Sequence, residues 1–160
     1  MSKSSIFGIR KDYTGEEIYS YGNSWLFSPI IWQVLPDKYI PRYIRTPFGY
    51  NKSIIGIGGD EVWGRTNEKV NHCDNTPDRV CWEMSNQQIF HTSDKKIIAD
   101  AIIAFLEQNK DYGETDEEGV HCIKKQHIID RFREIASDIL EIDETEFPFL
   151  FLKIQALTMV

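Results

Sequence analysis

Cysteine is scarce in this chain of 160 residues, which contains only Cys73, Cys81 and Cys122. Three is a small and odd number, so it cannot supply the disulfide framework of a small secreted domain. No apolar run approaches the roughly 20 residues that span a membrane, and residues 1–13, MSKSSIFGIRKDY, lack the apolar segment of a signal peptide. We therefore expect a cytoplasmic protein with reduced thiols and no membrane partner.

Basic residues are also fewer than acidic ones, and the net charge at pH 7 is −7. The first 92 residues hold ten basic and ten acidic side chains, whereas residues 93–160 hold eight basic and fifteen acidic ones. Nucleic-acid binding needs Lys and Arg to neutralise phosphates, so this balance argues against a nucleic-acid partner. It is compatible with a basic protein partner.

The composition is that of a globular protein, with 41% hydrophobic and 12% aromatic residues. A chain of this length can bury a sizeable core without disulfides or metals. The sequence predicts a single domain over residues 1–160, with residues 1–5 frayed.

Residues 93–109, SDKKIIADAIIAFLEQN, form the segment whose structure is predicted most clearly. Ser93 is a suitable N-cap, Asp94 favours the positive end of the helix dipole, and neither Gly nor Pro interrupts the run. The apolar positions recur as on one wide helix face: Ile97, Ile98, Ala101, Ile102, Phe105 and Leu106. A second helix is predicted over residues 123–141, with an apolar stripe of Ile128, Ile129, Phe132, Ile135, Ala136, Ile139 and Leu140.

The rest of the chain carries short strand and turn signals. Ser28-Pro29 is typical of a helix start, so a short helix is expected over residues 29–35, before Pro36. Residues 53–64, SIIGIGGDEVWG, predict a hairpin that turns at Gly58-Gly59-Asp60, followed by a loop over residues 65–79. Further strands are predicted at residues 5–11, 17–21, 43–45, 80–84, 88–91 and 149–157. This order predicts an α+β fold: an antiparallel or mixed sheet of about five to six strands with two main helices packed on one face.

The glycine loop at residues 56–60 follows a predicted strand, as a phosphate-binding loop does. A phosphate loop leads into a helix whose N-terminus holds the anion, usually with a Lys or Ser/Thr at a fixed spacing. Here Asp60 and Glu61 follow, which would place two negative charges beside the phosphates. The hairpin turn is the better interpretation.

Histidine and cysteine occur in adjacent pairs, His72-Cys73 and His121-Cys122. A zinc site needs about four converging ligands, commonly with two cysteines two to four residues apart, and no pair has that spacing. We expect buried thiols and surface histidines, no metal and no cofactor. No catalytic motif is present, so a binding protein is favoured over an enzyme.

Acidic residues gather beside two aromatic side chains. Trp63 follows Asp60 and Glu61, and Tyr112 lies within a dense acidic stretch, KDYGETDEEG. A charge run is usually a solvated loop, but an amphipathic aromatic within it is typical of interfaces. The regular carboxylate spacing of a calcium loop is absent. The candidate partner-binding residues are Asp60, Glu61, Trp63, Asp111, Tyr112, Glu114, Asp116, Glu117 and Glu118.

Small size, acidity, and the segments SIIGIGGDEVWG and KDYGETDEEG together make the chain resemble a bacterial toxin-immunity protein of the contact-dependent growth inhibition type. The resemblance implies a tight complex with a cognate toxin domain, often a basic nuclease. In that complex, acidic loops would replace nucleic-acid phosphates in the toxin's cleft.

Two other functions remain open. One is a small cytosolic enzyme, such as a Cys/His or metal-dependent hydrolase whose site is assembled from scattered residues. The other is an accessory binding protein of a phage or mobile element.

Overall fold

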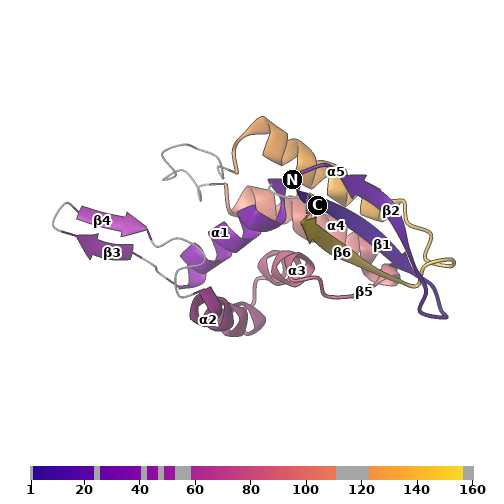
Figure 1. Cartoon of the computed structure of the whole chain (residues 1–160), viewed down its shortest axis with the longest axis horizontal. Coiled ribbons are helices and arrows are strands. Elements are labelled where there is room, and N and C mark those ends of the chain that lie inside the picture. The colour runs from indigo at the N-terminus through magenta and orange to yellow at the C-terminus, as the bar shows by residue number, and fades with distance from the viewer. Residues whose placement is uncertain are drawn as a thin grey trace.

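The computed structural model describes residues 2–23, 26–40, 43–46, 49–52, 59–110 and 123–156. Four antiparallel strands form the larger sheet, in the order β2-β1-β6-β5. Their bounds are Ser2–Ile9 for β1, Gly15–Tyr21 for β2, Phe90–His91 for β5 and Phe149–Ala156 for β6. Strands β3 (Tyr43–Thr46) and β4 (Gly49–Lys52) form a separate two-stranded sheet, drawn apart from the larger one in Figure 1.

The α+β class and the antiparallel sheet are confirmed, but the main sheet has four strands in the described residues, fewer than the predicted five to six. Residues 2–5, for which fraying is predicted from the sequence, belong to strand β1. Strand β1 is central and begins at Ser2, which pairs with Ala156, and Ser4 and Ser5 are buried. Pairing on both edges satisfies the backbone of this strand and fixes it in place.

Five α-helices occur in the described residues. They are α1 (Ser28–Tyr39), α2 (Gly59–Asn71), α3 (Thr76–Ser85), α4 (Lys95–Gln108) and α5 (Gln126–Leu140). Helices α4 and α5 confirm the two predicted helices. Three expectations were wrong: α2 replaces the return strand and residues 65–71 of the loop, α3 replaces the end of the loop and the strand at residues 80–84, and α1 continues past Pro36. Among these helices, none is long and apolar enough to cross a membrane.

Helix α3 follows from capping rather than from a clear apolar stripe. The Asn75 side chain accepts a 3.1 Å hydrogen bond from the Asp78 backbone N–H, and Pro77 lies in the first turn. Cys81, Trp82, Met84 and Ser85 are buried. Because a strand would send Cys81 and Trp82 to opposite faces, only a helix lets both enter one core.

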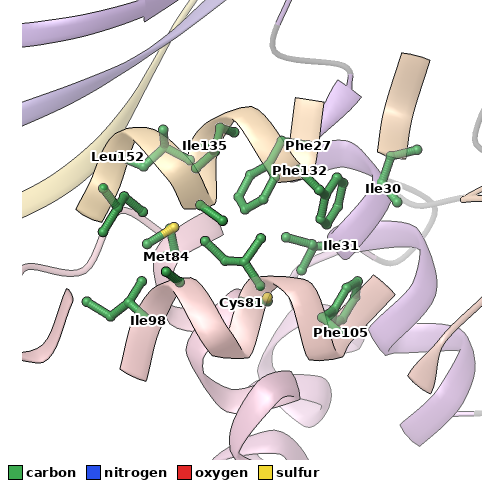
Figure 2. Packing of buried hydrophobic residues seen from close by; sticks show 14 of the residues in the cluster. Phe27, Ile30, Ile31, Cys81, Met84, Ile98, Phe105, Phe132, Ile135 and Leu152 are labelled. Carbon is green, nitrogen blue, oxygen red and sulfur yellow. The ribbon is translucent and has the colours of Figure 1, made fainter. Parts of the chain in front are cut away.

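The core lies between the sheet and the helices. In Figure 1, α4 and α5 cross behind β1, β2 and β6. Ile6, Leu150 and Leu152 from the sheet join the buried faces of these helices in one apolar cluster. Figure 2 shows Phe27, Phe105 and Phe132 gathered there; the Phe105 and Phe132 rings stack at 6.0 Å between centroids. Two residues expected inside are exposed instead: Ile97 is 57% and Leu140 43% accessible.

Candidate functional site

The predicted partner-binding residues fall in two groups. Asp60 and Glu61 belong to the first turn of α2, and Trp63 follows them on the same helix. Among Asp60, Glu61 and Trp63, the structure describes the side chain of Trp63 only. Asp111, Tyr112, Glu114, Asp116, Glu117 and Glu118 lie outside the described residues, so their position relative to Trp63 stays a prediction.

Trp63 is a large aromatic side chain held in place although 46% of it is exposed. Its indole Nε1–H donates a 2.8 Å hydrogen bond to Asn86 Oδ1, just beyond the end of α3. Its ring lies 6.2 Å from the ring of Trp82, which is buried. In turn Trp82 Nε1–H donates to Asn67 Oδ1 on α2 at 3.0 Å. Each indole is therefore fixed by an amide from the opposite helical segment.

Between these side chains lies a pocket of about 340 Å³, called the Trp63 pocket below. Figure 1 shows its two helices, α2 and α3, next to each other. Its lining is rich in aromatic and amide groups: Trp63, Asn67, Asn71, Trp82, Glu83, Asn86, Gln88 and Ile89. Ile89 is 60% exposed, so an apolar side chain and the Trp63 ring both remain accessible at the pocket.

The chain after α3 holds one wall of the pocket rigid. Gln87 has a left-handed backbone with φ 61°, and the backbone N–H of Gln88 donates to Glu83 O at 3.0 Å. The Gln87 side-chain oxygen accepts a 3.1 Å hydrogen bond from the backbone N–H of Ile154 on β6. Asn86 Nδ2 also donates to Trp82 O at 2.7 Å. The wall is thus tied to both α3 and the sheet.

The described lining of the pocket offers aromatic and amide contacts but few groups for catalysis. Among the lining residues that the structure describes there is no Cys, His or Lys, and the one ionisable side chain is Glu83. Within the described ranges, no three His, Cys, Asp or Glu side chains are placed to hold a metal; His121 and Cys122 fall outside those ranges. Cys73 and Cys81 are free thiols.

A second polar cluster lies around Asp78, which is completely buried. Its Oδ2 accepts hydrogen bonds from Lys38 Nζ at 2.7 Å and Tyr39 OH at 2.6 Å, and its Oδ1 accepts from Asn109 Nδ2 at 3.1 Å. Burial, followed by the bond to Asp78, raises the pKa of Tyr39 far above its usual range. Both carboxylate oxygens are occupied and the phenol stays protonated, so the cluster joins α1, α3 and α4 rather than presenting a base to solvent.

Sequence reasoning identified Trp63 and missed the other seven lining residues of the Trp63 pocket. The sequence predicts a loop and a strand over residues 65–84, and neither has the four-residue spacing that places these lining residues on one helix face. Trp63, Asn67 and Asn71 are four residues apart on α2, and Trp82 and Asn86 are four apart at the end of α3. Asn75 and Pro77 form the capping pattern that would have revealed α3.

Comparison with known proteins gives no independent identification. No protein-family model, curated protein or solved structure matches this chain.

Proposed function

We propose that this protein is a cytoplasmic immunity protein that binds and neutralises a basic, nuclease-like toxin domain. The observation that carries the proposal is Trp63. Its half-exposed indole is hydrogen-bonded in place, three residues after Asp60 on the first turns of α2. A rigid exposed tryptophan loses little conformational freedom on binding, and tryptophan is among the residues that dominate interface energies.

The charge distribution supports a basic partner. The whole excess of −7 lies in residues 93–160, and much of it is in the stretch from Asp111 to Glu118. Acidic side chains at the rim of an interface speed association with a basic surface, while the aromatic anchor slows dissociation. Fast, tight capture is what neutralising a toxin in the same cell requires.

The alternatives fit the described residues less well. A hydrolase needs a nucleophile or base that reaches substrate. The buried carboxylate of Asp78 is fully hydrogen-bonded, and the described lining of the Trp63 pocket offers none of these groups except Glu83. An accessory binding protein of a phage or mobile element would use the same surface without neutralising a toxin. Only a protection assay separates that function from immunity.

The test begins with the neighbouring genes. The C-terminal domain of a large secreted protein encoded directly upstream would be expressed in bacteria with and without this chain. We expect growth arrest by the domain alone, rescue by the parent chain, and a one-to-one complex in gel filtration. Trp63→Ala should weaken the complex about 30-fold or more, the loss expected at a hot spot.

The matched control is Tyr13→Ala, since Tyr13 is also a large aromatic residue and is 82% exposed in the β1–β2 turn. It should protect like the parent. Absence of any upstream toxin gene, or growth arrest that the parent chain does not relieve, would reject the immunity proposal.

A further inference from the structure

We infer that the Trp63 pocket binds an arginine side chain, with the guanidinium between the Trp63 ring and the Glu83 carboxylate. In the cell this arginine would belong to the basic partner, so its source rests on the proposed function. The chemistry of the pocket does not rest on the proposed function, because it depends only on residues whose positions are described.

The aromatic wall suits a flat cation. Guanidinium is planar, stacks on indole faces and is attracted by the ring quadrupole within about 6 Å of the centroid. The Trp63 ring is 46% exposed and cannot rotate freely, since its Nε1–H is bound to Asn86. A pocket of about 340 Å³ has room for one such group and part of its aliphatic stem.

The acceptors suit the same group. Glu83 is half-buried at the pocket, and in the described part of the chain no ion pair includes it. Arg79, one turn earlier on α3, donates instead to Thr76 Oγ1 at 3.2 Å. A carboxylate accepts two parallel bonds from guanidinium, which also adds specificity.

The amides complete the set of acceptors. Asn67 Oδ1 and Asn86 Oδ1 each accept one indole N–H, and each carbonyl oxygen has a second lone pair. Arginine offers five N–H donors and no acceptor, so it can use these oxygens together with those of Asn71 and Gln88.

The charge of the lining favours arginine over a neutral ligand. Seven of the eight lining residues that the structure describes are uncharged, and the eighth is acidic. A sugar or a nucleobase would also stack on Trp63 and bond to the amides, but it would leave the Glu83 charge without a counter-ion. A lysine ammonium would pair with Glu83 without the planar stacking.

The experiment titrates the full-length protein with N-acetyl-arginine amide and follows the indole N–H signals by NMR, with Trp63 assigned from the Trp63→Phe variant. We expect saturable shifts of the Trp63 and Trp82 signals. N-acetyl-citrulline amide has nearly the same shape without the charge and should bind at least about 10-fold more weakly, as should N-acetyl-lysine amide. Glu83→Gln should lower arginine affinity at least about 10-fold, whereas the control Glu68→Gln, at an exposed position on α2, should not.

Three results would overturn the inference: equal binding of citrulline, no effect of Glu83→Gln, or a larger response to glucose or adenosine than to arginine. The immunity proposal fails separately. If toxin is neutralised and Trp63→Ala abolishes protection, but the arginine probe does not bind, the inference alone is wrong. If the probe binds as expected but no toxin is neutralised, immunity is wrong and the pocket chemistry stands.

Discussion

The phenol of Tyr39 and the carboxylate of Asp78 are joined by a 2.6 Å hydrogen bond that links the last turn of α1 to the first turn of α3. Lys38 on the same turn binds the same oxygen. Together they explain how α1 continues for three residues beyond Pro36, which interrupts helical hydrogen bonding. Tertiary bonds hold a turn that local propensity disfavours.

Removing the shared acceptor should therefore be costly. Asp78→Ala leaves Lys38, Tyr39 and Asn109 without their carboxylate, and we expect a loss of about 3 kcal/mol in the free energy of unfolding. This is the low end for a broken buried ion pair, because the Lys38 side chain keeps 22% of its exposure to water. Urea unfolding measures the change.

The control for that measurement is Asp74→Ala, an exposed aspartate four residues earlier. It should change the free energy of unfolding by less than about 0.5 kcal/mol. Equal effects of the two substitutions would mean that the Asp78 cluster contributes nothing specific.

Two hydrogen-bonded phenols, the buried Tyr21 and the partly buried Tyr39, should make stability fall at alkaline pH. Burial, and then the bond from Tyr21 to Asp138, raises the pKa of Tyr21 well above its usual value; burial and Asp78 do the same for Tyr39. The folded state thus holds these protons more tightly than the unfolded state. Their contribution is complete below about pH 10, the unfolded pKa, and is lost as the pH rises above it.

Unfolding by urea between pH 8 and pH 11 tests this expectation. The double variant Tyr21→Phe, Tyr39→Phe should be less stable than the parent at pH 8, because it loses two hydrogen bonds, but its stability should fall less between pH 9 and pH 11. Tyr13→Phe, at an exposed position, is the control and should follow the parent. Parallel curves for the parent and the double variant would show that neither phenol is protected.

The stacked pair Phe105 and Phe132 should carry much of the core energy. Both are fully buried, one on α4 and one on α5. Replacing either by Ala removes a ring from a close-packed region, and we expect a cost of about 3–5 kcal/mol. Ile97→Ala on α4 is the control, since Ile97 is 57% exposed and should cost under about 1 kcal/mol. A cost under 1 kcal/mol at both phenylalanines would contradict this packing.

The acidic stretch should act mainly on association rate. Changing Glu114, Asp116, Glu117 and Glu118 to Lys together should slow binding to the toxin domain and flatten its salt dependence, because long-range attraction is reversed. Stopped-flow or surface-based kinetics at several salt concentrations measure this effect. A variant that binds and protects like the parent would leave the Trp63 pocket as the main interface.

The strongest periodic signals in the sequence determined helices α4 and α5. Their apolar residues recur with helical spacing, so burying one face against the sheet decides the conformation with little help from elsewhere. Even there the sequence overstated the buried face, since Ile97 and Leu140 lie at its margins and remain exposed.

Helices α2 and α3, and with them the Trp63 pocket, were decided by tertiary structure. Residues 59–85 are polar, with few apolar positions to define a period, and Gly58-Gly59-Asp60 suggests a turn as readily as a helix start. Val70, Cys81, Trp82 and Met84 enter the core only when both segments are helical. The same packing brings Trp63 to Asn86 and Trp82 to Asn67, and pairs so far apart in sequence come together only once the core they share has formed.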